Sequence, residues 1–185
     1  SAASDFYKLQ VYGSQYGSTR RYAEKLSEET GIPAVSYKDA PNLSGMKTIV
    51  YLGSLYAGGV LGLAKTLRNF SLQEGQKLLL VTVGLADPTE PENQHNIRTS
   101  LQKQLPAELL DRAMLFHLRG GIDYQKLSFG HRTMMKLLYQ SLRRTPVEKQ
   151  TAENRALIET YGKQVDFTDF SALEPFVLEV QRNII

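Results

Sequence analysis

The sequence contains no cysteine and no tryptophan, and only three of its 185 residues are histidine. The absence of cysteine excludes disulfides, thiolate metal sites, iron–sulfur clusters and a cysteine nucleophile. His95, His117 and His131 show no metal-ligand spacing, and no cluster of carboxylates lies beside them. We therefore predict no metal site.

Long apolar runs are also missing from the chain. None approaches the roughly 20 residues that a membrane-spanning helix needs, and the start of the sequence has no signal peptide with an apolar centre. Together with the absence of cysteine, this pattern predicts a cytoplasmic protein.

The composition is typical of a globular protein with one core of ordinary size. Hydrophobic residues make up 42% of the chain and charged residues 22%, and the formal net charge is +3. A chain of this length is too short for two domains that each have a hydrophobic core of ordinary size. We predict a single domain over residues 5–185.

Short apolar runs alternate with amphipathic helical stretches along the chain, which predicts a parallel sheet with crossover helices. The runs from Thr48 to Leu52 and from Leu78 to Val83 are largely apolar, as expected for strands buried on both faces. The predicted strands are 6–12, 34–37, 47–53, 77–84 and 113–118, and the predicted helices are 19–30, 61–69, 91–105, 129–143 and 171–185.

A loop rich in hydroxyl groups and glycine follows the first predicted strand and leads directly into a helix. The first N–H groups of a helix lack internal partners and carry the positive end of the helix dipole, so they favour a bound anion. The loop lacks the lysine of a nucleoside triphosphate loop and the glycine spacing of a dinucleotide fingerprint. It predicts a phosphate site or, alternatively, an ordinary N-capped helix, at Ser14, Gln15, Tyr16, Gly17, Ser18 and Thr19.

Two later loops have the composition of binding loops. In a doubly wound sheet, ligands bind beyond the carboxyl ends of the strands, where the strand order reverses. The loops after the third and fourth predicted strands start at such ends, and both are rich in glycine. Their candidate binding residues are Ser54, Leu55, Tyr56, Ala57 and Gly58 in the first loop, and Gly84, Leu85, Ala86 and Asp87 in the second.

Together, the three loops resemble those of the flavodoxin family, and the resemblance covers nearly the whole chain. The family's phosphate-loop pattern of hydroxyl-x-x-Gly-x-Thr is met by Ser14, Gly17 and Thr19, whereas Tyr16 stands where a hydroxyl often precedes the glycine. The resemblance implies a doubly wound, five-stranded parallel sheet of order 2-1-3-4-5 with helices on both faces. It also implies FMN as the cofactor, with its phosphate in the first loop and its isoalloxazine ring between the other two, and it adds Gly120 to the cofactor-binding residues.

The last third of the chain carries a more specific resemblance. The segment His117–Leu138 is similar to one that distinguishes the quinone-dependent, flavodoxin-like protoporphyrinogen oxidases of bacteria. These enzymes have an added, partly basic helix after the fifth strand, and Arg132 and Lys136 hold the matching basic positions. The resemblance therefore implies such a helix here.

This added segment is strongly basic. Between His117 and Arg144, six Lys or Arg residues accompany one acidic residue, Asp123, which gives six minus one, a formal charge of +5. A basic amphipathic helix from Phe129 to Arg143 can bind an anionic membrane surface or can pack its apolar stripe on the domain. We keep both alternatives, and we predict no nucleic-acid binding because stacking aromatics and docking motifs are missing. The predicted apolar stripe consists of Leu127, His131, Met134, Leu138 and Leu142.

The sequence thus predicts an FMN-binding oxidoreductase in which the flavin supplies the chemistry, so no residue is assigned as a catalyst. Few carboxylates lie in the loops predicted to flank the ring, which favours a less negative potential. We therefore expect two-electron exchange with a quinone or a similar small acceptor, in the manner of a protoporphyrinogen dehydrogenase. Two alternatives stay open: a one-electron carrier that docks on a redox protein, and a flavodoxin-fold module without flavin.

Overall fold

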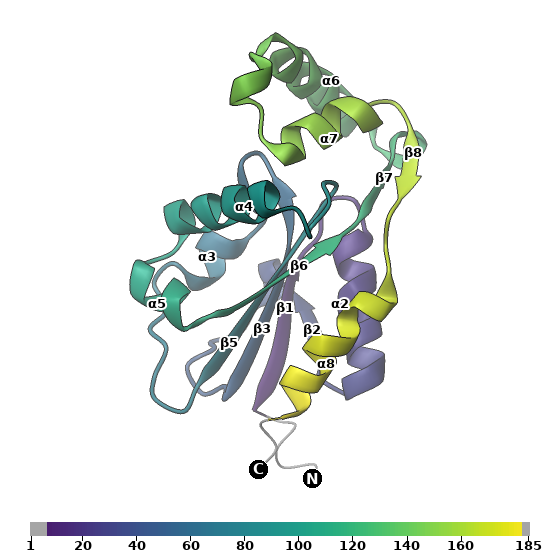
Figure 1. Cartoon of the computed structure of the whole chain (residues 1–185). Helices are drawn as coiled ribbons and strands as arrows, with labels where there is room; N and C mark the ends of the chain where they lie inside the picture. The colour runs from purple at the N-terminus through teal and green to yellow at the C-terminus, as the bar shows by residue number, and fades with distance from the viewer. Residues whose placement is uncertain (1–6, 183–185) are drawn as a thin grey trace.

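The computed structural model of the chain describes residues 7–182. Its centre is a parallel sheet of five strands in the order β2-β1-β3-β5-β6, and a short strand, β4, pairs antiparallel with β3 (Figure 1). The strands β5 and β6 are the fourth and fifth predicted strands, so the expected order 2-1-3-4-5 is confirmed. The strands are β1 (Lys8–Gly13), β2 (Ala34–Ser36), β3 (Thr48–Tyr56), β4 (Gly59–Val60), β5 (Lys77–Gly84) and β6 (Met114–Arg119).

The register of the sheet brings the predicted binding loops to one edge. Thr48 at the start of β3 pairs with Lys8 of β1 and with Lys77 of β5, so the three central strands begin at the same level. At their other ends, Gly84 of β5 pairs with Arg119 of β6. The loops after β1, β3, β5 and β6 therefore lie at the carboxyl edge of the sheet.

Helices cover both faces of the sheet (Figure 1). One face carries α2 and α8, and the other carries α3, α4 and α5. Each face buries its own apolar cluster: Tyr22 and Phe176 on the first side, and Leu67 and Leu101 on the second, are at most 1% exposed. The helices are α2 (Ser18–Thr30), α3 (Leu63–Leu67), α4 (Pro91–Gln104), α5 (Ala107–Arg112) and α8 (Glu174–Gln181).

A further group of elements lies beyond the carboxyl edge of the sheet, at the top of Figure 1. We call this part, residues 121–166, the cap. Its own apolar cluster buries Met135 and Ala156 of the cap with Leu85 and Ala86 from the loop after β5. The cap elements are β7 (Gly121–Asp123), α6 (Phe129–Arg144), α7 (Ala152–Thr160) and β8 (Gln164–Asp166), and β7 pairs antiparallel with β8.

The predicted basic helix after the fifth strand is present as α6. The helix predicted at 61–69 is shorter, because Gly62 has a left-handed φ of 77° and α3 begins only after it. In place of the helix predicted at 171–185, a short 3-10 helix over Phe170–Leu173 precedes α8. Residues 183–185 of that prediction, and Phe6 of the first predicted strand, lie outside the described residues.

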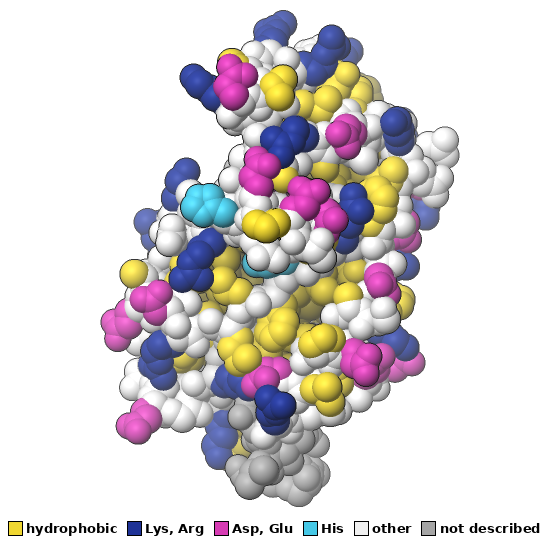
Figure 2. All heavy atoms as spheres, viewed as in Figure 1, with side chains coloured by type: hydrophobic (Ala, Val, Ile, Leu, Met, Phe, Trp, Pro, Cys, Tyr) yellow, Lys and Arg dark blue, Asp and Glu magenta, His cyan; other side chains and the backbone are white. Residues whose placement is uncertain are grey.

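Several short elements were not predicted, namely β4, α5, α7, β7 and β8. Over residues 7–182, no helix is long and apolar enough to cross a bilayer. Basic and hydrophobic side chains lie side by side at the top of the molecule, over the cap (Figure 2).

Candidate functional site

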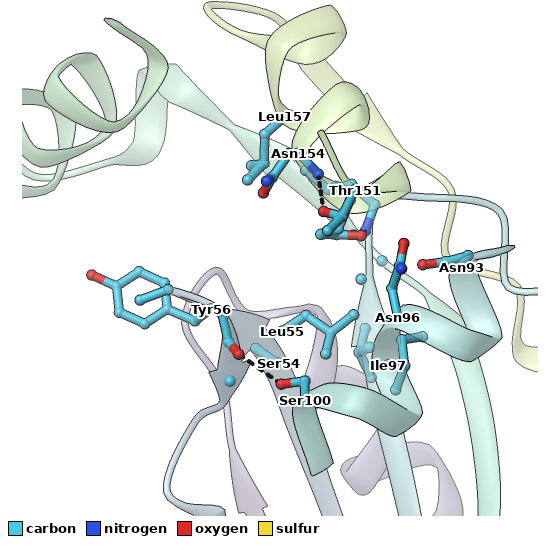
Figure 3. A pocket seen from close by; sticks show the side chains of 18 of the residues that line it. Ser54, Leu55, Tyr56, Asn93, Asn96, Ile97, Ser100, Thr151, Asn154 and Leu157 are labelled. Atoms are coloured by element: carbon cyan, nitrogen blue, oxygen red, sulfur yellow. Dashed lines mark hydrogen bonds between the residues drawn. The ribbon is translucent and has the colours of Figure 1, made fainter. Parts of the chain in front are cut away.

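A cavity of about 440 Å³ lies between the carboxyl edge of the sheet and the cap. Figure 3 shows how its walls face each other: Thr151, Asn154 and Leu157, at the start of α7 and within it, lie opposite Leu55 of β3 and Ile97 of α4. Cavities of this size typically hold a small molecule or a cofactor.

The cavity brings together residues from all three predicted binding loops. Ten of the sixteen predicted cofactor-binding residues line it, and six do not. Those that line it are Tyr16, Ser18, Ser54, Leu55, Tyr56, Ala57, Gly58, Gly84, Leu85 and Gly120. The six outside the lining are Ser14, Gln15, Gly17, Thr19, Ala86 and Asp87.

The predicted phosphate loop enters α2 through Gly17, whose left-handed φ of 94° suits glycine. Ser14 Oγ accepts hydrogen bonds from the backbone N–H groups of Gly17 and Arg20 at 3.1 and 3.2 Å. Unpartnered N–H groups at the start of a helix fit a phosphate group. Within the described residues, the N–H groups of Tyr16, Ser18 and Thr19, in this loop and the first turn of α2, lack a hydrogen-bond partner.

Buried hydroxyl groups tie this loop to its neighbours. Thr19 Oγ1 lies 2.7 Å from Ser54 Oγ, which also accepts a hydrogen bond from Gln15 N at 3.1 Å. Ser18 Oγ accepts a hydrogen bond from Gly121 N at 2.9 Å and donates to Gly121 O at 3.3 Å. These bonds fix the phosphate loop against β3 on one side and against the cap on the other.

Glu153 of α7 holds the loop after β5 from the cap side. Its two carboxylate oxygens accept hydrogen bonds from Leu85 N at 2.8 and 3.0 Å, and one of them also accepts from Ala86 N at 3.0 Å. Burial raises the pKa of this carboxyl, although the bonds from Ala86 and Leu85 and the nearby Arg119 oppose the increase. A side chain of the cap thus occupies two backbone donors of a predicted binding loop.

Two tyrosines attach α6 to the binding loops. The Tyr16 hydroxyl donates to Met135 Sδ at 2.9 Å, and the Tyr56 hydroxyl donates to Met134 Sδ at 2.8 Å. Burial, with a smaller contribution from Tyr56, raises the pKa of the Tyr16 phenol, so the hydroxyl remains a donor at neutral pH. Figure 3 shows the Tyr56 ring pointing away from the other labelled residues.

Sequence reasoning missed the contributions of α4 and α7 to the cavity. The α4 residues that line the cavity are spaced by three or four positions, so they share one face of the helix. This pattern, next to a binding loop, could have indicated them. Glu153 and Asn154 lie in a segment with no predicted element and carried no such signal. The α4 residues that line the cavity include Asn93, Asn96, Ile97, Ser100 and Lys103.

The fold and the position of the cavity define a flavodoxin-like α/β protein, with a ligand site at the edge where the strand order reverses beside β1. The family model of the flavodoxin domain matches residues 9–148, and the chain belongs to this family. Membership implies an FMN-binding redox function. The matched region includes α6 but ends before α7.

Two flavodoxins of known structure are similar to the chain. Oxidised flavodoxin 1 from Bacillus cereus is 14% identical, with 60% of this chain and 83% of that protein covered and a TM-score of 0.43. A cysteine-to-alanine mutant of flavodoxin from Pseudomonas aeruginosa is 19% identical, with 72% and 95% covered and a TM-score of 0.37. No curated protein sequence matches the chain.

The residues of the site fit FMN. The unpartnered N–H groups at the start of α2 suit its phosphate, and the loops after β3 and β5 both line the cavity. Gly84 leaves room between these loops: a Cβ atom at this position would lie 2.7 Å from both Leu55 Cδ1 and a Glu153 carboxylate oxygen, so these side chains would have to shift.

Proposed function

We propose that the protein is an FMN-dependent oxidoreductase that exchanges two electrons with a quinone, with a protoporphyrinogen dehydrogenase as its nearest enzymatic analogue. The observation that carries this proposal is the cavity under the cap. A one-electron carrier needs an exposed flavin edge on which a partner protein can dock. Here α6 and α7 cover the binding loops and leave a cavity of about 440 Å³, which is the size of a small-molecule site.

Each part of the site has a separate task in this proposal. FMN supplies the electron-transfer chemistry when bound. The start of α2 holds the phosphate, residues 54–58 and 84–85 flank the ring, and Gly120 adds backbone after the end of β6. The cap excludes water from the cavity through apolar side chains such as Leu138 and Leu157.

Arg119 favours the less negative potential that this reaction needs. Its Nε donates to the backbone oxygen of Leu85 at 2.8 Å, and its guanidinium lies 3.7 Å from the centre of the Phe167 ring. A positive charge fixed beside the loop that flanks the ring stabilises an anionic reduced flavin. We expect Arg119→Gln to lower the midpoint potential of the bound flavin in a redox titration. An unchanged potential would remove this support.

Flavin binding is tested by titrating the flavin-free protein with FMN and with riboflavin while following flavin fluorescence. We expect FMN to bind much more tightly, because riboflavin has no phosphate for the start of α2. Gly17→Val should abolish this preference, since Gly17 has a φ of 94° in the phosphate loop. Gly31→Val is the matched control, because Gly31 ends the same helix with a φ of 75° and also has open space around it. Equal binding of the two flavins would contradict the phosphate assignment.

The choice of acceptor is tested by mixing the photoreduced, FMN-loaded protein with menadione or with cytochrome c in a stopped-flow instrument. The proposal requires rapid reoxidation by menadione and slow reoxidation by cytochrome c. The opposite order would favour the one-electron carrier. Protoporphyrinogen, with menadione as the acceptor, then tests the enzymatic analogue.

A second candidate role, contact with an anionic membrane surface, is favoured by the exposed side of α6. Phe129 is 86% exposed and Leu137 is 63% exposed, and the basic residues Arg132, Lys136, Arg143 and Arg144 lie on the same helix. Each basic residue near an anionic surface contributes about 1 kcal/mol. Such a contact would bring the cavity under the cap close to quinones dissolved in the membrane.

This role is tested by sedimentation with vesicles that contain phosphatidylserine, an anionic lipid that attracts basic residues. We expect Leu137→Ser to reduce binding and Leu178→Ser to leave it unchanged, because Leu178 is 58% exposed but lies on α8, away from the cap. Equal loss in both variants, or binding that does not weaken in salt, would contradict a specific contact through α6.

A further inference from the structure

The cavity continues beyond the loops predicted to flank the flavin ring, into a space between α4 and α7. Figure 3 shows this space, with Asn96 and Ile97 of α4 on one side and Asn154 and Leu157 of α7 on the other. We call it the α4–α7 pocket. None of the predicted cofactor-binding residues lies on α4 or α7, so no ligand has yet been assigned to this part of the cavity.

Asn93 is the most informative residue of the α4–α7 pocket. Its side chain is 2% exposed, and Nδ2 donates to the backbone oxygen of Asp87 at 2.9 Å. This bond fixes the orientation of the amide, because the opposite orientation would place two oxygens against each other. Within the described residues, Asn93 Oδ1 is buried and receives no hydrogen bond. A buried acceptor without a donor is costly and uncommon.

Asn96, almost one turn further along α4, repeats this feature. Its Oδ1 is also buried without a donor among the described residues. In Figure 3 the amides of Asn93 and Asn96 lie close together at one end of the pocket and are directed toward the space below α7. The apolar side chains of Ile97 and Leu157 line the same cavity. The pocket therefore combines an apolar wall with two acceptors that lack donors.

A ligand that satisfies this pocket must be largely apolar and must carry hydrogen-bond donors. A quinone carbonyl is only an acceptor and cannot satisfy Asn93 Oδ1, whereas a ring hydroxyl or a ring N–H can. We propose that the α4–α7 pocket binds an aromatic ring that bears a hydroxyl or N–H group, with Asn93 Oδ1 and Asn96 Oδ1 as its acceptors. This inference deepens the proposed function, because it places the reduced, donor-bearing partner of the flavin between α4 and α7.

The test uses two redox-inert probes that differ in one donor, 2-naphthol and its methyl ether, 2-methoxynaphthalene. Their fluorescence can be followed in the flavin-free protein without interference from tryptophan, since the chain has none. The wild-type protein should bind 2-naphthol about tenfold more tightly than the ether, the effect of one good hydrogen bond. Asn93→Leu and Asn96→Leu should each reduce this preference. The matched control is Gln94→Leu, because Gln94 is exposed on α4 and does not line the cavity.

Circular dichroism verifies that each variant is folded, and Asn96→Leu keeps the test valid if Asn93→Leu does not fold. FMN titrations of the same variants separate the inference from the proposed function. If the wild type prefers 2-naphthol but does not bind FMN, the pocket assignment stands and the proposed function fails. Equal binding of the two probes by the wild type, or a preference that survives both asparagine substitutions, overturns the inference. Loss of FMN affinity in Asn93→Leu also overturns it, because the amide would then serve the flavin.

Discussion

The sheet and the cap are held together in different ways. In β3, seven of nine residues are buried, whereas α6 buries only Met135 and Leu142 of its 16 residues. The sheet is stabilised by apolar burial that is spread over many side chains. The cap joins the rest of the chain through one small apolar cluster and a few polar contacts.

Several of the polar contacts that hold the cap end on the predicted binding loops. Glu153 accepts hydrogen bonds from the loop after β5, and Tyr16 and Ser18 of the phosphate-loop region bond to Met135 and Gly121 of the cap. Closure of the cavity and the positions of these loops are therefore coupled. An element with few buried contacts can open locally while the core stays folded, and we expect the cap to be that element.

The largest expected effect distinguishes the two regions by stability. Leu79→Ala, in the centre of β5 and fully buried, should lower the free energy of unfolding by about 2–5 kcal/mol, because it leaves a cavity in the core. Leu137→Ala, on the exposed side of α6, should change it by less than about 0.5 kcal/mol. Urea denaturation measures both. A similar loss in the two variants would show that the cap is part of the cooperative core.

The next effect concerns attachment of the cap. Glu153→Ala leaves the N–H groups of Leu85 and Ala86 without their acceptor, at a cost of about 1–3 kcal/mol. We expect faster hydrogen exchange at these two amides and in α7, with little change in the strands. The control is Glu159→Ala, since Glu159 is exposed on the same helix. Faster exchange throughout β3 and β5 would mean that the cap and the sheet open together, and would contradict local opening of the cap.

This contrast also explains what could be predicted from the sequence. The strands β3 and β5 were predicted to within a few residues because burial on both faces demands an uninterrupted apolar run. The rule that ligands lie where the strand order reverses predicted that the loops after the first, third and fourth predicted strands meet at one edge of the sheet, and they do. That these loops bind a ligand stays a prediction. Glu153 could not be predicted, because its partners are backbone N–H groups, which leave no pattern in the sequence, and because Leu85 is 68 residues away.

The buried face of α6 shows a second limit. The predicted apolar stripe included His131 and Met134, but both are exposed, and Met135 is buried in their place. Leu138 and Leu142 of the predicted stripe do lie on the inner side of α6, where they line the cavity. The prediction is therefore wrong only in the first half of the helix, where Met135 and not Met134 is buried. Met135 packs against α7 and accepts a hydrogen bond from Tyr16, and neither contact could be read from the sequence of α6 alone.

A smaller effect should appear in the pH dependence of stability. Burial raises the pKa of Glu153 in the folded protein, so the folded state holds the proton more tightly than the unfolded chain. The resulting stabilisation is present below the ordinary glutamate pKa of about 4.3 and is lost as the pH rises through the raised value. Glu153→Gln resembles the protonated form at every pH. As the pH rises above the ordinary glutamate pKa of about 4.3, the wild type loses this stabilisation and the Gln variant does not. The unfolding free energy of the variant should therefore increase relative to that of the wild type towards neutral pH. A constant difference would contradict the raised pKa.

The smallest effect has the opposite sign and lies in the sheet. Burial lowers the pKa of His117, whose Nδ1 lies 2.7 Å from Thr82 Oγ1. As the pH falls below the ordinary histidine pKa of about 6.5, the unfolded chain binds a proton before the folded protein does, and stability decreases. His117→Gln should weaken this decrease, whereas His95→Gln should not, because His95 is exposed on α4. Denaturant unfolding on both sides of that pKa measures the difference. If both variants follow the wild type, His117 does not cause the decrease in stability at low pH. The decrease would then arise from carboxylates at the surface and not from the buried sheet.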